Sequence, residues 1–273
     1  MLRKLGYALV IGWVAFTFIL VGWVFFASLS TSAEIFSDHM FEFRSGFHIS
    51  NYIKAWTTQR LSVFFMNSIF YTVVSITTII LIASPASYAL SRFSFRGNTI
   101  IQNLFAAALG IPVIMIIMPL FGLASSFRLI GNRWMLMFLY IGMNVPFSVF
   151  FLLAFFKNLS PSYEESAAID GCSSFRTFWK IMLPLVQPGI ITLTVFNFVT
   201  VWNEFFVALI FANRPEIRPV SVGIFNLYQS MRYTGDWGGL YAGMVIILLP
   251  TIILYLFLSE KIIKGVTAGA IKG

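Results

Sequence analysis

The sequence predicts an all-α protein: a polytopic membrane helix bundle with six transmembrane helices and one polar loop. Hydrophobic residues make up 59% of the 273 residues and charged residues only 10%, and the mean hydropathy is +0.87. A chain this apolar cannot bury its hydrophobic surface in one soluble core. Six apolar stretches each reach the roughly twenty residues needed to cross a bilayer. Of all the ionised side chains, only Glu204 falls inside one of these stretches.

The spans are expected, with approximate edges, at residues 7–29, 63–90, 99–123, 134–156, 189–212 and 239–259. Arg3 and Lys4 precede the first stretch, which is longer than the apolar core of a signal peptide, so we expect it to be a transmembrane helix. The segments between the spans are too short to hold a separate soluble domain. One membrane domain over residues 1–273 is therefore predicted.

Basic residues predict the orientation of the bundle. An even number of spans places both termini on one side, and Lys and Arg residues adjoin the span ends on that side. These residues are Arg3, Lys4, Arg92, Arg96, Lys157, Lys261 and Lys264. Both termini are therefore expected in the cytoplasm.

The charge pattern argues against nucleic-acid binding, and the cysteine content argues against an internal disulfide. The formal net charge is +8, but the basic residues stand singly between apolar spans instead of forming a stripe. They are membrane-flanking anchors facing lipid, and no nucleic-acid binding is expected. The single cysteine, Cys172, cannot form a disulfide within the chain, and its place in the polar loop predicts a reducing, cytosolic setting.

Proline and glycine residues predict irregular spans. Pro85, Pro112, Pro119 and Pro146 fall inside expected helices, where each removes a backbone hydrogen bond and favours a kink. The kinks either shape the helices for packing or provide a bendable path through the bundle. Gly239 and Gly243 have the spacing of a close helix contact.

Signatures of enzymatic chemistry are missing from the sequence. No glycine–lysine pair is followed by Ser or Thr, so the chain has no Walker-type loop for ATP phosphates. His39 and His48 lie outside any zinc motif, and no nucleophile elbow occurs. We expect no catalytic residue, no metal site and no cofactor bound by this chain. Active transport would then need an ion gradient or a partner protein.

Glu204, with Asn203 beside it, is the one ionisable group expected inside the membrane. Such groups are costly in lipid and are usually retained for function. Three roles remain open for Glu204: a hydrogen-bonding clamp between helices, a place in a hydrophilic translocation path that includes Asn203, or a proton relay.

The polar loop, about residues 157–188, predicts a helix, a tight turn and a second helix. Pro161 and Ser162 are helix-starting residues, and Glu164 and Glu165 would lie in the first turn, where the helix dipole favours acidic groups. Gly171 readily takes the left-handed conformation of a C-terminal cap. Ser173 or Ser174 can then begin an amphipathic helix carrying Phe175, Phe178, Trp179 and Met182. Taken alone, this hairpin either covers the bundle at the membrane surface or docks a partner.

The residues of this loop resemble a known family. Residues 165–172 read ESAAIDGC and are followed by Ile181, Leu183, Pro184 and Pro188. This run is similar to the EAA loop of permease subunits of binding-protein-dependent ABC importers, whose pattern is E-A-A-x-x-x-G with a later I-x-L-P. Ser166 and Cys172 depart from the usual alanines, and both are small enough to pack in the same way.

Other segments resemble the carbohydrate-uptake branch of these importers, and in particular its maltose-transporter G-type permeases. They are the run from Trp202 to Phe205, Asn67 with Ser68, Asn51 with Tyr52, and the tail from Lys264 to Gly273. The resemblance implies the type I ABC importer fold and a place in a bacterial-type inner membrane. It also implies these partners: a second permease subunit, two cytoplasmic ATPase subunits that use ATP and Mg, an external solute-binding protein, and a sugar.

The resemblance further implies that the polar loop is a coupling helix set into a groove of an ATPase subunit. Glu165 would contact the ATPase surface, Ala167 and Ala168 would permit close approach, Asp170 would cap and orient the helix, and Gly171 would fix the turn. Gly265, Gly269 and Lys272 of the tail would also contact the ATPase subunits. The alternatives are a permease for another polar solute, a gradient-driven carrier that uses Glu204, and a membrane scaffold or enzyme subunit without solute flux.

Overall fold

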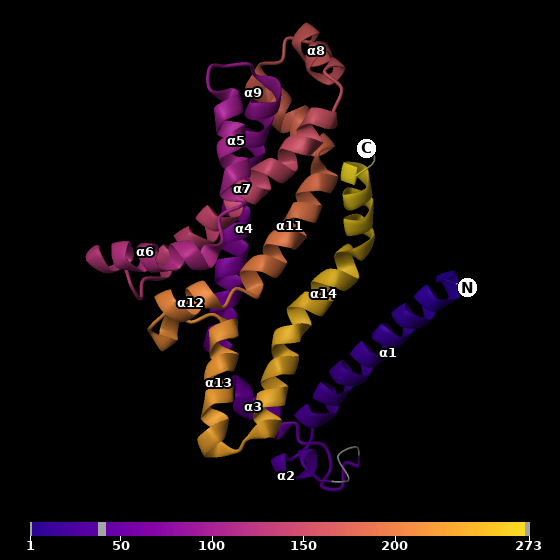
Figure 1. Ribbon diagram of the computed structural model, residues 1–273, viewed down its shortest axis with the longest axis vertical. Coiled ribbons are helices and arrows are strands. Elements are labelled where there is room, and N and C mark those ends of the chain that lie inside the picture. Colours follow the sequence, from indigo (N-terminus) through magenta and orange to yellow (C-terminus); the bar gives the residue numbers. More distant parts are fainter. Residues whose placement is uncertain (1, 38–41, 271–273) are drawn as a thin grey trace. The chain divides into compact units, whose positions relative to one another are not determined.

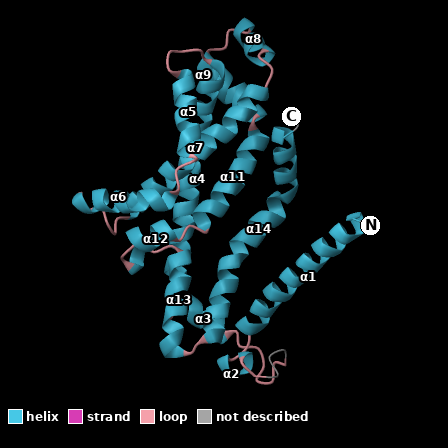
Figure 2. Cartoon of the chain, in the orientation of Figure 1, coloured by secondary structure: helices cyan, strands magenta, loops and turns pink. Residues whose placement is uncertain are grey.

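In the computed structural model, residues 2–37 and 42–270 are described, and every regular element among them is helical (Figures 1 and 2). The chain divides into two compact units. Unit 1 comprises Met1–Met66 and Pro219–Ile252, and unit 2 comprises Asn67–Arg218 and Ile253–Gly273. Two long helices, α4 (Leu61–Arg92) and α14 (Trp237–Ala270), contribute to both units. A single membrane domain over residues 1–273 stays a prediction.

Unit 1 contains the N-terminal helices and the helix before α14. In addition to parts of α4 and α14, it holds α1 (Leu2–Ser28), α2 (Ser32–Ile35), α3 (Ser50–Trp56) and α13 (Val220–Thr234). The side-chain amide of Asn51, on α3, donates hydrogen bonds to the carbonyl oxygens of Ser28 (3.0 Å) and Ser30 (2.9 Å). Gly238 lies against this cluster: a Cβ there would come within 2.5 Å of the Asn51 amide nitrogen. The start of α14 can therefore approach the chain that follows α1 only because residue 238 has no side chain.

Unit 2 contains most of the helices and the main buried core. Between α4 and the end of α14 it holds α5 (Asn98–Ala108), α6 (Val113–Ser126), α7 (Arg133–Asn158), α8 (Ser162–Ile169), α9 (Ser174–Thr177), a π-helical turn (Phe178–Met182), α10 (Leu183–Leu185), α11 (Gln187–Trp202), α12 (Phe206–Phe211) and a 3₁₀ turn (Pro215–Ile217). Its core cluster includes Tyr88, Leu152, Phe156, Phe178 and Met182. These side chains come from α4, α7 and the π-helical turn, so they join the polar loop to two long helices.

Four helices are each long and apolar enough to cross a membrane: Arg3–Ser28, Leu61–Arg92, Arg133–Asn158 and Trp237–Leu258. Two bent helix pairs, Asn98–Ala108 with Val113–Ser126 and Ser174–Leu185 with Gln187–Trp202, bring the number among the described residues to six if each pair is one span. This agrees with the predicted number of spans. The first span has an 18-residue apolar window with no buried residue, as expected of a helix surrounded by lipid.

The third predicted span is not one continuous helix. Its two parts, α5 and α6, meet at 99°. Pro112, expected inside the helix, lies at the break, with φ −64° and ψ 129° immediately before α6. Proline disfavours helical geometry in the residue before it and donates no backbone hydrogen bond, so the first helix ends and a new one begins. Pro85, Pro119 and Pro146 do lie inside helices as predicted, and Pro250 lies inside α14.

The fifth predicted span, residues 189–212, is also interrupted. α11 ends at Trp202, and a separate short helix, α12, begins at Phe206. On its other side, α11 bends by 72° from the helices that precede it. At this end Gly189 packs under the Phe155 ring of α7, where a Cβ would come within 2.8 Å of ring carbons. The predicted close approach at Gly243 is present too, because a Cβ added there would lie 3.2 Å from the Ile224 side chain of α13.

Candidate functional site

The first helix of the polar loop forms where the sequence predicts it. α8 runs from Ser162 to Ile169 with Pro161 at its N-terminal boundary, and Glu164 and Glu165 lie in its first turn. Acidic side chains there face the positive end of the helix dipole. In unit 2, α8 and α9 lie together at one end (Figure 1).

The turn after α8 is closed by Gly171. Its φ is +75°, in the left-handed region, as the sequence predicts. The Gly171 N–H donates to the carbonyl oxygen of Ala168 (3.0 Å), and the Cys172 N–H donates to that of Ala167 (2.9 Å). This pair of bonds is the Schellman motif, which ends a helix and reverses the chain within a few residues.

The second helix departs from the single amphipathic helix that the sequence predicts. Ser173 accepts a hydrogen bond from the Arg176 N–H and so caps α9, but the chain continues as a π-helical turn before α10. Pro184 has no N–H to donate to the preceding turn, and wider π spacing there agrees with that loss. Phe178 and Met182 are buried, whereas Phe175 and Trp179 are exposed. Two of the four predicted apolar residues therefore remain on the surface.

The residues predicted to meet an ATPase differ in their exposure to solvent. Glu165, Ala168, Asp170 and Gly171 are exposed, and the neighbouring Ile169 is 87% exposed. Ala167 is the one buried residue of α8, at 2% exposure. Ala167 packs inward on its own chain, so of the two alanines only Ala168 is available to a partner.

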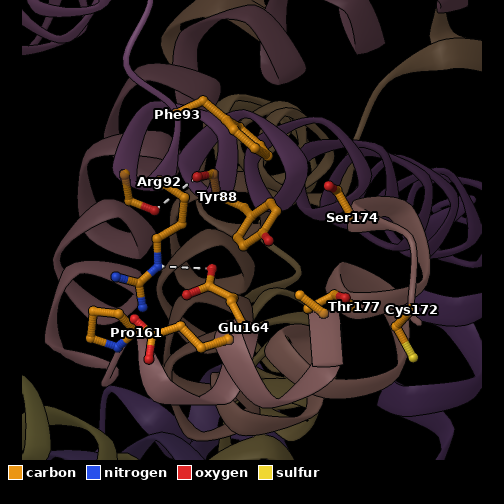
Figure 3. A pocket seen from close by; sticks show the side chains of 11 residues that line it. Tyr88, Arg92, Phe93, Pro161, Glu164, Cys172, Ser174 and Thr177 are labelled. Carbon is orange, nitrogen blue, oxygen red and sulfur yellow. Dashed lines mark hydrogen bonds and ion pairs between the residues drawn. The ribbon is translucent and has the colours of Figure 1, made fainter. Parts of the chain in front are cut away.

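A pocket of about 370 Å³ lies between α8 and the end of α4 (Figure 3). Its lining residues are Tyr88, Ser91, Arg92, Phe93, Pro161, Glu164, Glu165, Ala168, Cys172, Ser174 and Thr177. Across it the Arg92 guanidinium forms an ion pair with the Glu164 carboxylate, with Nε and Oε1 3.1 Å apart. Sequence reasoning assigned no pairing role to either residue. Each residue was noted for another reason: Arg92 as a basic residue at the end of a span, and Glu164 as an acid in the first turn of a helix.

Asn203 and Glu204 lie at the interruption between α11 and α12. The Asn203 side chain is exposed and donates to the Val199 carbonyl oxygen (2.9 Å). The two Glu204 carboxylate oxygens accept from the N–H groups of Val207 (2.7 Å) and Ala208 (3.0 Å). Free N–H groups at a helix start need such acceptors. Glu204 therefore caps α12, which gives it a structural role, while a place for Asn203 and Glu204 in a translocation path stays a prediction.

Substitution of Glu204 by Gln is expected to weaken this cap and leave uptake intact. An amide offers one acceptor oxygen where the carboxylate offers two, and loss of a cap costs about 1 kcal/mol. A decrease of about 2–4 °C in the melting temperature of the purified complex should follow. Uptake should persist and should not respond to an uncoupler. The matched control is Glu216→Gln, an exposed acid in the 3₁₀ turn, which should melt like the wild type. Lost uptake at an unchanged melting temperature would instead give Glu204 a role in transport.

Asn67, on α4, makes polar contacts that the sequence did not predict, as the Arg92–Glu164 pair does. Its amide nitrogen donates to the carbonyl oxygens of Glu216 (2.8 Å) and Arg218 (3.0 Å), and its oxygen accepts from Arg133 (2.8 Å). Asn67 is only 5% exposed. Buried amides are stable where their hydrogen bonds are made, so Asn67 fixes the segment after α12 against α4 and α7.

Of the three tail residues predicted to contact an ATPase, two lie among the described residues. Gly265 and Gly269 lie in the last part of α14. Lys272 lies outside the described residues. Contact of this tail with ATPase subunits stays a prediction.

Comparison with known proteins gives matches over nearly the whole chain. The family described as "Binding-protein-dependent transport system inner membrane component" matches residues 79–267. The diacetylchitobiose uptake system permease protein NgcG of Streptomyces coelicolor is 30% identical over 268 residues, which cover 98% of this chain and 88% of the relative. The trehalose/maltose transport system permease protein MalG of Thermococcus litoralis is 30% identical over 253 residues, 92% of this chain and 90% of the relative.

A solved structure matches the fold. In the crystal structure of a bacterial ABC transporter involved in the import of the acidic polysaccharide alginate, one chain aligns with a TM-score of 0.79 at 23% identity. The alignment covers 95% of this chain and 96% of that chain. The helical arrangement described above is therefore that of an ABC importer permease, the type I importer fold that the sequence predicts.

Proposed function

Because this chain belongs to the family of inner membrane components of binding-protein-dependent transport systems, we propose that it is the permease subunit of an ATP-driven importer for a sugar or an oligosaccharide. It forms half of a translocation path across the membrane and performs no covalent chemistry. The energy comes from separate ATPase subunits, because this sequence has no Walker-type loop of its own.

The substrate class is supported by the names of the relatives. Diacetylchitobiose and trehalose or maltose are saccharides, and the relatives that take these names align over at least 92% of this chain. The run from Trp202 to Phe205 and the tail, both similar to the carbohydrate branch, support the same class. This chain is therefore assigned a saccharide as its transported solute.

The exposed end of α8 carries the proposed coupling. Glu165, Ala168 and Asp170 are exposed there beside the almost fully exposed Ile169. A docked protein partner would bury the apolar surface that Ile169 exposes to water. α8 is assigned to a groove on an ATPase subunit, which places α8 and both termini in the cytoplasm.

The complete importer then contains four kinds of subunit. This chain pairs with a second permease, each permease meets one ATPase subunit, and an external binding protein delivers the solute. ATP on one side and the loaded binding protein on the other bias the path between its two access states.

The exposed helix-turn-helix of residues 162–177, with its Glu165-to-Gly171 sequence, is the observation that carries this proposal. Reconstitution in vesicles with the co-purifying subunits tests it. A saccharide presented with its binding protein should stimulate ATP hydrolysis and enter the vesicles only with ATP. Uptake abolished by an uncoupler and indifferent to ATP would indicate a gradient-driven carrier. Uptake of a non-saccharide solute alone would change the substrate class, and no flux of any solute would indicate a scaffold.

A further inference from the structure

The two neighbouring acids of α8 face different surroundings. Glu165 is exposed, whereas Glu164 turns toward α4 and pairs with Arg92 at 3.1 Å (Figure 3). The paired side chains are 13% exposed for Arg92 and 21% exposed for Glu164. The pair is therefore mostly withdrawn from water, which strengthens its attraction compared with a fully solvated pair.

Arg92 makes a second contact with its guanidinium group. One of its terminal nitrogens donates to the carbonyl oxygen of Leu159 (2.8 Å), the residue that follows α7. The planar guanidinium presents several donors in a fixed geometry. One side chain on α4 thus holds both the end of α7 and the first turn of α8.

Few other contacts hold α8 to α4. Ala167 is the single buried residue of α8, and the pocket of about 370 Å³ occupies the space between this helix and the end of α4. α4 itself is firmly fixed, since Tyr88, one turn before Arg92, packs against Phe156 and Phe178 with ring centroids 5.6 and 5.1 Å apart. Across this pocket, α8 therefore meets the well-packed α4 mainly through Glu164, which pairs with Arg92 and also interacts with the Tyr88 hydroxyl.

We propose that Arg92 and Glu164 form a charged tie that transmits movement of α8 to the long helix α4. Both are positioning residues: Glu165 meets the partner, and the tie carries the displacement into the bundle. The proposal rests on the proposed function. Packed apolar surface normally transmits such displacement. Between α8 and α4, the pocket leaves little packed apolar surface.

Paired substitutions in the full chain, reconstituted in the complete complex, test the tie. Glu164→Gln removes the charge at constant shape, and Arg92→Lys keeps the charge but not the two-way geometry. Arg92→Gln, made alone and together with Glu164→Gln, completes a double-mutant cycle. The control is Glu42→Gln, which removes the carboxylate of the exposed Arg44 pair in the first loop.

Two readouts are measured. The first is solute taken up per ATP hydrolysed, which should fall about fivefold or more in each tie variant and stay normal in the control. The double variant should be no worse than Arg92→Gln, because both remove the same contact. The second is the alkylation rate of Cys172, which is half-buried beside the pocket. That rate should rise severalfold in Glu164→Gln as α8 loosens.

Each other outcome has a defined meaning. Normal uptake per ATP in an assembled Glu164→Gln complex would overturn the tie, as would losses that multiply in the double variant. Failure of every tie variant, including Arg92→Lys, to assemble would also overturn it, because the pair would then hold the fold without coupling it. A wild-type complex without ATP-driven uptake would contradict the proposed function instead, and the Cys172 rates would still report on whether the pair holds α8.

Discussion

Replacement of Glu165 by Lys is expected to abolish coupled uptake while the protein still inserts in the membrane. Glu165 is exposed in the first turn of α8, so a lysine there costs the isolated chain only about 0.3–1 kcal/mol against the helix dipole. At the proposed ATPase contact, the reversal places like charges together, which costs several kcal/mol. Affinity for the ATPase should therefore fall by more than about tenfold.

Three measurements decide this prediction: membrane content, co-purification of the ATPase subunits, and solute taken up per ATP hydrolysed. Glu165→Gln, which removes the charge without reversing it, should give an intermediate loss. Glu42→Lys makes the same change in the first loop, at a side chain paired with Arg44 on the surface, and should leave ATPase binding unchanged. Normal uptake by an assembled Glu165→Lys complex would show that α8 does not dock through this acid.

Replacement of Gly171 by Val should be comparably damaging, for a reason that lies in the backbone. Gly171 has a φ of +75°, and no atom lies within 4 Å of the position that a Cβ would take. A side chain therefore fits in space, and the penalty is that of the left-handed conformation, roughly 1–2 kcal/mol and greatest for a β-branched residue. The turn is expected to relax and to move α8 relative to α9, with loss of coupled uptake.

Matched variants separate this backbone effect from a general loss of stability. Gly171→Asn should retain uptake, because asparagine tolerates left-handed geometry. Gly46→Val introduces the same strain at a φ of +86° with equally open surroundings, but in the first loop, and uptake per ATP should stay normal. Equal uptake by Gly171→Val and Gly171→Asn would show that the turn geometry is not required for coupling.

Local signals account for what the sequence could predict about the loop. Pro161, Gly171 and Ser173 act on the backbone within a turn of their own positions, and each does in the structure what its residue type favours. The continuation of α9 is different. Whether Phe178 or Trp179 is buried depends on the π-helical turn and on the ring of Tyr88, which comes from a distant segment.

The same distinction explains the interrupted spans. Pro112 predicts a lost hydrogen bond, but the 99° between α5 and α6 also depends on what each helix packs against. The polar pair Asn203 and Glu204 was visible as an anomaly in an apolar stretch, yet its use as the end of α11 and the cap of α12 appears only when the backbone is in place. α13, within the long segment between the last two predicted spans, is too polar to stand out as a membrane helix.

The sequence by itself determined the all-α membrane class, the helix-turn-helix and the resemblance to importer permeases, because hydrophobic length, caps and motifs are properties of neighbouring residues. The tertiary structure decided which of two adjacent acids faces outward. It turned Glu164 to Arg92, left Glu165 exposed and buried Ala167 but not Ala168. Those choices depend on contacts between α4, α7 and α8, and pairing across such sequence separation cannot be read from the spacing of residues along one helix.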